Sequence, residues 1–175
     1  MNIQKTYNDF ESIIKKWETA LDNHTIEELQ KKENQDSWSV GQVYIHLINS
    51  ALEFHFKQID ICLKTNENQN QKKNFKGFLA YRLLNGFPPI KIKVPPSDAY
   101  TPKQPVSITE IKEELKAVKQ KMSKTIPLLN QSTKKGKTAH PGFNYLNAEE
   151  WYKLIVMHYK HHLRQRETIV AFLNQ

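Results

Sequence analysis

The chain has 175 residues and a mass of 20.6 kDa, enough for one domain with a substantial apolar core, and no break in composition divides residues 1–175. Its single cysteine, Cys62, excludes an intramolecular disulfide and a thiolate-based zinc site, and the lack of a signal-peptide core or of an apolar run of roughly 20 residues predicts a soluble, cytoplasmic protein without a membrane partner. The net charge of +8 raises nucleic acid or another anion as a partner, but the basic residues are scattered through loops and among glutamates, which favours ordinary solvation over nucleic-acid binding.

The first half of the chain predicts two long helices. The first runs roughly from Thr6 to Lys32, because its apolar residues recur every three or four positions. After a polar break, the second begins at Ser37 or Ser39, either of which can cap it, and continues through Ile61. Residues 65–73 are rich in Asn, Gln and Lys and are expected to form a surface loop.

A long connection follows the second helix. Residues 75–84 can form a short helix, but the chain beyond Gly86 must be extended or turning because it contains six prolines between positions 88 and 105. Long connections in compact domains are frequently functional, so this one could cover a site. The only run that alternates with a period of two, Ile90 to Val94, has no partner strand, and we therefore expect no sheet.

Two further helices complete the chain. The third begins at Ser107 or Thr109, with Glu110 placed for a capping box from Ser107, and Pro127 closes or kinks it. A basic, turn-rich loop covers residues 134–147. Asn147 then caps a last helix from Ala148 to Leu173. The fold class is therefore all-α, a four-helix bundle with a long crossover between helices two and three.

The last helix carries the most informative pattern in the chain. His158 and His162 are four residues apart, so they project from one face about one turn apart and can aim at a single point. They also fall on the core-facing apolar stripe of that helix. A buried imidazole without a partner costs on the order of 1–3 kcal/mol. A metal ion with neutral imidazole ligands would satisfy both, and His46 in the second helix can complete a three-histidine site.

With these residues in view, the chain resembles the DinB/YfiT-like family of four-helix-bundle metal-dependent enzymes over nearly its whole length. The resemblance rests on three segments: Trp38 to Leu47 with His46, Glu150-Trp151 followed by His158 to Gln165, and the turn His140-Pro141-Gly142-Phe143. It implies metal binding by His46, His158 and His162. It also implies a divalent ion with open coordination positions, nickel or zinc first and manganese or iron as alternatives. Some members of the family transfer low-molecular-weight thiols.

Helical phase places His46 at the edge of its apolar stripe, from where it can reach inward or open onto a cleft. A catalytic site requires the second, because a catalytic metal keeps a position for water or substrate. The expected function is metal-dependent transfer or hydrolysis of a small molecule through an activated water or thiol. The resemblance to the family implies a low-molecular-weight thiol as one candidate substrate.

Other side chains are candidates for supporting roles at the site. His161, Gln165 and Glu53 are candidates to hydrogen-bond the metal-binding histidines or to transfer protons. Ordinary roles are expected for His24 and His55, and a turn role for His140, which a loop above the bundle could bring to a substrate. The three tryptophans are expected to anchor the core, namely Trp17, Trp38 and Trp151.

An alternative from another class stays open. In it the metal is structural or vestigial, and the bundle is a stress-related binding or dimerisation module, including a homodimer. A coordinatively closed site would favour this interpretation, whereas an open coordination position favours the enzyme.

Overall fold

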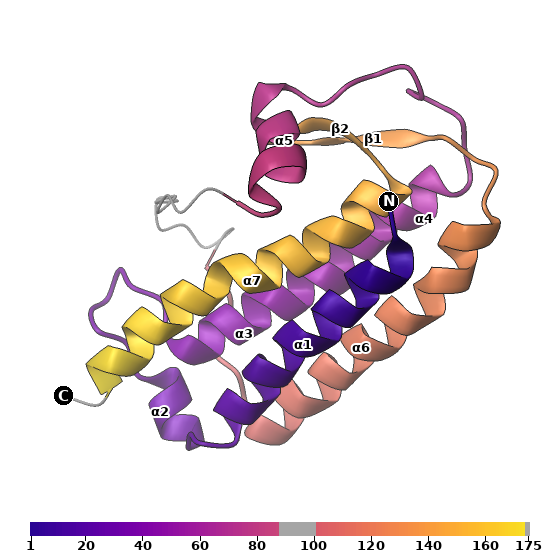
Figure 1. The fold of residues 1–175 in the computed structure, drawn as a ribbon. Coiled ribbons are helices and arrows are strands. Elements are labelled where there is room, and N and C mark those ends of the chain that lie inside the picture. Colours follow the sequence, from indigo (N-terminus) through magenta and orange to yellow (C-terminus); the bar gives the residue numbers. More distant parts are fainter. Residues whose placement is uncertain (88–100, 174–175) are drawn as a thin grey trace.

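A computed structural model describes residues 1–87 and 101–173, and its main body is a bundle of four helical rods (Figure 1). Helix α1 packs against α6 and α7, and the second rod, which begins with α3, also contacts both of these helices. The predicted all-α bundle with a long crossover is confirmed. The four rods are α1 (Ile3–Leu21), the continuous segment α3 (Val40–Asn49), η1 (Ser50–His55) and α4 (Phe56–Cys62), α6 (Ile108–Gln131), and α7 (Ala148–Leu173).

The first predicted helix was too long. The chain leaves α1 after Leu21 and starts a separate short helix, α2 (Ile26–Gln30). The reason is local, because Thr25 forms a capping box with Glu28: the Glu28 N–H donates to Thr25 Oγ1 at 3.3 Å, and the Thr25 N–H donates to Glu28 Oε2 at 2.9 Å. A new helix start thus interrupts a continuous periodic pattern.

The second rod begins at Ser39, one of the two residues predicted to cap it. Ser39 is the N-cap of α3, with its hydroxyl oxygen accepting the Gln42 N–H at 3.1 Å and the Ser39 N–H donating to Gln42 Oε1 at 3.1 Å. Ser37 instead belongs to the preceding turn. The sequence did not indicate η1, a π-helical turn between α3 and α4. Because π-helical turns are wider than α-helical ones, residues after η1 face directions that a 3.6-residue period does not give.

The crossover from α4 to α6 carries the predicted short helix, which consists of α5 (Phe75–Leu79) and the π-helical turn η2 (Ala80–Leu84). Asn74 caps α5 by accepting the Gly77 N–H at 2.9 Å, and Asn85 ends η2 with a left-handed φ of 47°. The period-two run from Ile90 to Val94 lies outside the described residues.

The third rod, α6, begins after Ser107, whose hydroxyl accepts the Glu110 N–H at 3.1 Å as predicted. It does not end at Pro127 but continues to Gln131. Leu129, in the turn beyond the proline, is buried in the core. This tertiary contact stabilises a last turn that lacks one backbone hydrogen bond.

The basic loop before α7 contains a β-hairpin, which the sequence did not predict. Strands β1 (Lys137–His140) and β2 (Asn144–Asn147) pair antiparallel, and β2 runs directly into α7. A hairpin of four-residue strands is marginal on its own in water. This one lies over the amino-terminal end of α7 (Figure 1), contacts α4 and α7, and buries Leu146 completely. Asn147 caps α7 as predicted, accepting the Glu150 N–H at 2.9 Å.

Two of the three tryptophans anchor the core. Trp17 and Trp151 are fully buried, and their ring N–H groups donate to the Tyr159 carbonyl oxygen at 3.2 Å and to Thr138 Oγ1 at 2.8 Å. Trp38 is only half-buried and lies against His46 with ring centroids 5.1 Å apart. Its role is therefore tied to that histidine as well as to the core.

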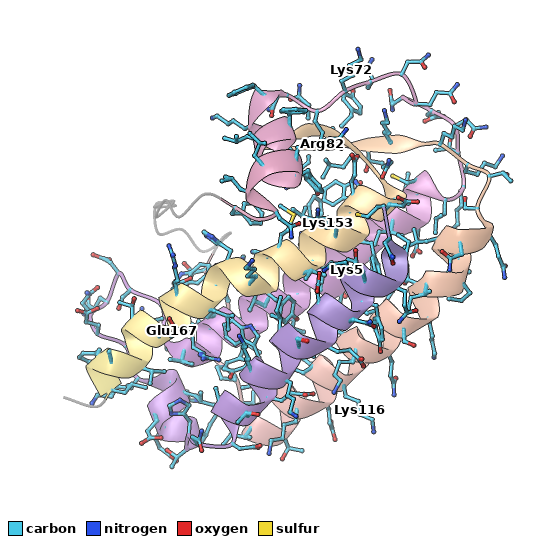
Figure 2. All side chains as sticks on the ribbon, in the orientation of Figure 1. Lys5, Lys72, Arg82, Lys116, Lys153 and Glu167 are labelled. Carbon is cyan, nitrogen blue, oxygen red and sulfur yellow. The ribbon has the colours of Figure 1, made fainter. Side chains whose placement is uncertain are left out.

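Basic side chains are spread over the outside of the molecule. Lys72 projects from the connection before α5, whereas Lys116 projects from α6 on the opposite side (Figure 2). Other lysines of α6 form ion pairs with α1, such as Lys119 with Glu18 at 2.9 Å. No helix in the described parts of the chain is both long and apolar enough to cross a bilayer.

Candidate metal centre

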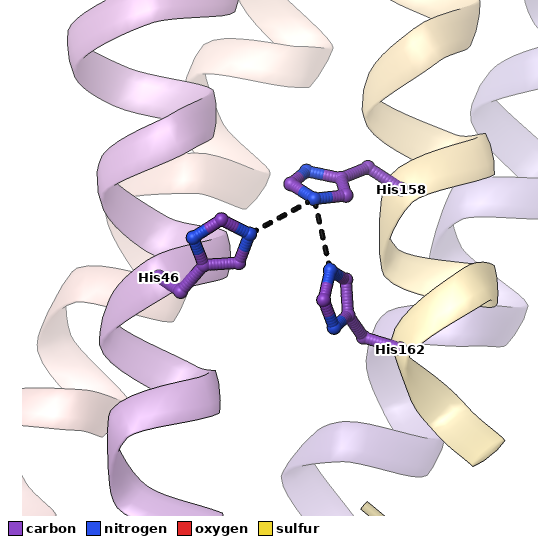
Figure 3. Close-up of side chains that lie close together, drawn as sticks. All are labelled: His46, His158 and His162. Carbon is purple, nitrogen blue, oxygen red and sulfur yellow. Dashed lines mark hydrogen bonds between the residues drawn. The ribbon is translucent and has the colours of Figure 1, made fainter. Parts of the chain in front are cut away.

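Three histidine side chains converge between the second rod and α7 (Figure 3). His158 and His162 lie one turn apart on α7, with their Nε2 atoms 3.0 Å apart. His46 reaches across from the last turn of α3, and its Nε2 lies 3.0 Å from that of His158. One ligand atom from each residue thus lies within 4.8 Å of the other two. The structure brings together the three residues named as metal ligands from the sequence.

The donor set fits a metal ion better than it fits a hydrogen-bonded cluster. Each imidazole nitrogen offers one lone pair or one N–H in the plane of its ring. His158 Nε2 faces two other nitrogens at 3.0 Å and can make a well-directed hydrogen bond with only one of them. Ligands bound about 2.0–2.1 Å from one ion, at angles of roughly 90–110°, are separated by about 2.9–3.4 Å. The two spacings from His158 Nε2, 3.0 Å each, lie within that range.

The surroundings keep these imidazoles neutral, which is the form that binds metal. Burial lowers the pKa of His46 to about 4, with a further contribution from neighbouring His162. Burial also lowers the pKa of His162 to about 4 and holds the pKa of fully buried His158 well below its usual range. At neutral pH each of the three imidazoles is therefore uncharged and offers one ring nitrogen with a free lone pair.

A model of the DinB superfamily matches residues 9–165, nearly the whole chain. The chain belongs to the DinB superfamily. A search of curated proteins finds no match. Membership of the DinB superfamily and the three-histidine group together fit a metal-binding protein.

Gln165 contacts one histidine of this group, His162. Its Oε1 lies 2.6 Å from His162 Nδ1, so the Nδ1–H donates to the amide oxygen and the Nε2 lone pair is left free for a metal. This arrangement agrees with the contact that the sequence suggested for Gln165. The fixed tautomer follows from the oxygen being an acceptor only.

Replacing Gln165 with alanine is expected to weaken metal binding about 10- to 100-fold, because His162 loses the partner that fixes its tautomer and ring orientation. Competition with a chromophoric chelator would measure the affinity. The matched control is Glu167→Gln, an exposed change on the same helix (Figure 2), which should leave the affinity unchanged. Equal affinities for the Gln165 variant and the wild type would contradict this role.

Of the other two candidates, His161 lies beside the three histidines and Glu53 does not. His161 is half-buried beside the centre, with its ring 5.2 Å from those of His162 and Phe87. Glu53 is not brought to the histidines. It lies in η1, its side chain is 67% exposed, and its Oε2 accepts a hydrogen bond from Lys57 Nζ at 2.6 Å. The π-helical turn gives Glu53 a direction that regular helical phase did not anticipate.

Two further histidines flank the centre and were assigned ordinary roles from the sequence. His55, the last residue of η1, is buried, lies 5.5 Å from the His158 ring, and has an Nδ1 without a hydrogen-bond partner in the described chain. His140 is held at the hairpin turn, where its Nδ1 accepts the N–H groups of Gly142 at 3.0 Å and Phe143 at 3.1 Å. The position of His55 could not be predicted from helical periodicity because it lies in the π-helical turn. The position of His140 could be predicted, because the His140-Pro141 pair indicates a turn.

A cleft of about 550 Å³ borders the centre on the His46 side. One wall comes from α3 and η1 and the other from the first turns of α6, with a strap of coil between them. His46 is therefore both a member of the histidine group and part of the cleft wall. The lining residues are Ile45, His46, Asn49, Ser50, Thr101, Pro102, Lys103, Gln104, Pro105, Val106, Glu110 and Glu114.

Proposed function

We propose that this protein is a divalent-metal-dependent enzyme that transfers or hydrolyses a small molecule by activating a thiol or a water. The observation that carries the proposal is the convergence of three neutral ring nitrogens, from His46, His158 and His162, beside a cleft. A purely structural ion would be served by a closed set of four ligands. Three ligands next to a cleft favour an ion that also meets a substrate.

Each part of the site has a distinct task. The three imidazoles are uncharged, so they would hold a divalent ion without reducing its positive charge. A divalent ion held there would lower the pKa of a thiol or water and so supply a nucleophile at neutral pH. Gln165 fixes the tautomer of His162, and Trp38 packs against the His46 ring. The cleft admits the substrate from the His46 side.

Aromatic side chains cover the His158 side of the centre. Phe87 lies 6.2 Å from the His158 ring and stacks on Phe143 from the hairpin at 5.5 Å. Trp151 lies 5.9 Å from His55, which in turn packs on His158. These contacts exclude water from one side of the histidine group. Access is thereby directed through the cleft.

The experiment is a comparison of loaded and metal-free protein in two reactions. Protein loaded with nickel, zinc, manganese or iron would be assayed for hydrolysis of 4-nitrophenyl acetate and for conjugation of cysteine with 1-chloro-2,4-dinitrobenzene. We expect metal-dependent turnover in one reaction, with nickel or zinc most active, and its loss in His158→Ala. Full metal occupancy without turnover, and a coordinatively closed ion in its absorption spectrum, would support the non-catalytic module instead.

A further inference from the structure

Among the residues that line the cleft, Glu114 has an unusual environment for a surface-helix carboxylate. It lies on α6 and faces the same cleft as His46, which comes from the opposite wall. Its Oε2 is buried and has no hydrogen-bond partner in the described residues. A buried carboxylate oxygen without a partner is costly, so such a group is a candidate to bind a donor from outside the chain.

Neighbouring acidic groups on the same surface are already engaged. Glu110, one turn before Glu114 and also in the cleft wall, accepts the Val106 N–H at 2.9 Å. Where α1 meets α6, Asp22 pairs with Lys112 at 2.7 Å and Glu18 pairs with Lys119. Among the described residues, Glu114 is therefore distinguished by a carboxylate oxygen that lacks such a partner, not merely by being acidic.

The surroundings of Glu114 disfavour its ionised form. Its Oε2 is buried, and burial together with the charge of Glu110 raises the pKa of its carboxyl. A positively charged ligand group beside Glu114 would offset both effects.

Within residues 1–87 and 101–173, no basic side chain forms an ion pair with Glu114. Lys103 is the basic residue of the cleft lining, but it is exposed and makes no ion pair in the described structure. Gln104 is committed elsewhere, since its Oε1 accepts from the Ser39 hydroxyl at 2.8 Å and its Nε2 donates to the Gln30 carbonyl at 3.2 Å. Apart from Glu110, the remaining polar residues of the lining are neutral.

We propose that Glu114 is the specificity-determining residue of this cleft and binds a primary ammonium group of the substrate. This inference rests on the proposed function, because it assigns the substrate two ends. One end is the thiol or other group directed to the histidine centre, and the other is an ammonium that pairs with Glu114 across the cleft. The ligand class is thus a small ω-aminothiol or a related amine, rather than a neutral thiol.

The test uses protein loaded with cobalt(II), whose thiolate charge-transfer absorption reports thiol binding independently of turnover. Three aminothiols with chains of two, three and six carbons would be titrated against hydroxythiols of equal length. We expect at least one aminothiol to bind about tenfold more tightly than its hydroxyl counterpart, the gain typical of a charge-assisted hydrogen bond. The Glu114→Gln variant should lose this preference and keep its affinity for the hydroxythiols.

The matched control is Glu110→Gln, which changes the other carboxylate of the cleft and should keep the preference for the aminothiol. Equal affinity within every pair in the wild type would overturn the proposal. A preference that persists in Glu114→Gln would also overturn it, because the amine would then bind to the metal itself.

A metal-free arm separates this inference from the proposed function. Backbone amide NMR shifts on α6 would be followed while n-butylammonium or n-butanol is added to the metal-free protein. Shifts near Glu114 with the ammonium alone, absent in Glu114→Gln, would support the amine site even if no thiol bound to cobalt. No shifts and no charge-transfer band would overturn the amine site and thiol activation together, and would leave only hydrolysis by an activated water from the proposed function.

Discussion

His158→Ala is expected to remove bound metal almost completely, from near one ion per chain to less than about a tenth of that. The reason is the central position of this residue, whose Nε2 lies 3.0 Å from the Nε2 atoms of both His46 and His162. Loss of a contact behind a ligand costs about 10- to 100-fold in metal affinity, and loss of the ligand itself costs more. Elemental mass spectrometry on protein purified without a histidine tag or chelator would measure the content.

Alanine at His46 or His162 is expected to act in the same direction, since each leaves only two ring nitrogens at the centre. His24→Ala is the matched control. His24 lies in the turn between α1 and α2, where its Nδ1 faces Glu28 Oε2 at 3.5 Å, and its loss should not change the metal content. Wild-type protein that neither carries nor takes up a divalent ion would contradict the metal centre, as would full occupancy in His158→Ala.

The parts of the fold that could be predicted are those that depend on local chemistry. Ser39, Ser107 and Asn147 start helices because their side-chain oxygens accept N–H groups two or three residues ahead, a pattern that is visible in sequence. The same rule at Thr25, where Glu28 follows, was available and would have divided the first predicted helix correctly.

Other parts depend on contacts between distant segments. The hairpin of β1 and β2 has strands of four residues, too short for a period-two pattern to be recognised. Its stability comes from packing on α4 and α7, which no local rule expresses. The π-helical turn η1 likewise could not be predicted from local sequence rules. Because of this turn, Glu53 faces solvent while His55 is buried.

The candidate site also has one part that depends on local spacing and one that depends on contacts between distant segments. The convergence of His158 and His162 follows from a spacing of four residues on one helix. His46 is 112 positions away from His158, so their contact depends on how α3 packs against α7. Helical phase alone placed His46 at a stripe edge, and the resemblance to the DinB/YfiT-like family supplied the pairing. No sequence pattern singled out Glu114, because the feature that distinguishes it is a buried oxygen without a hydrogen-bond partner in the described residues.

A second large effect is expected on acidification of the metal-free protein, which should lose stability as the pH falls from about 6.5 to 4. Burial lowers the pKa of His55 to about 3 and that of His140 to about 4. In the unfolded chain both regain an ordinary pKa near 6.5. Below that value the unfolded state binds protons that the native state does not, so the free energy of unfolding is highest above pH 6.5 and decreases toward pH 4.

The contribution of one histidine can be isolated with His140→Asn. Asparagine Oδ1 can accept the Gly142 N–H that His140 Nδ1 accepts at 3.0 Å, but it does not titrate. Urea unfolding at pH 7.5, 6 and 5 should therefore show a shallower decrease for the variant. The difference approaches about 1.4 kcal/mol per pH unit, one proton, and solvent screening at the half-buried ring reduces it. Because the other histidines titrate equally in both proteins, identical slopes would mean that folding does not lower the pKa of His140.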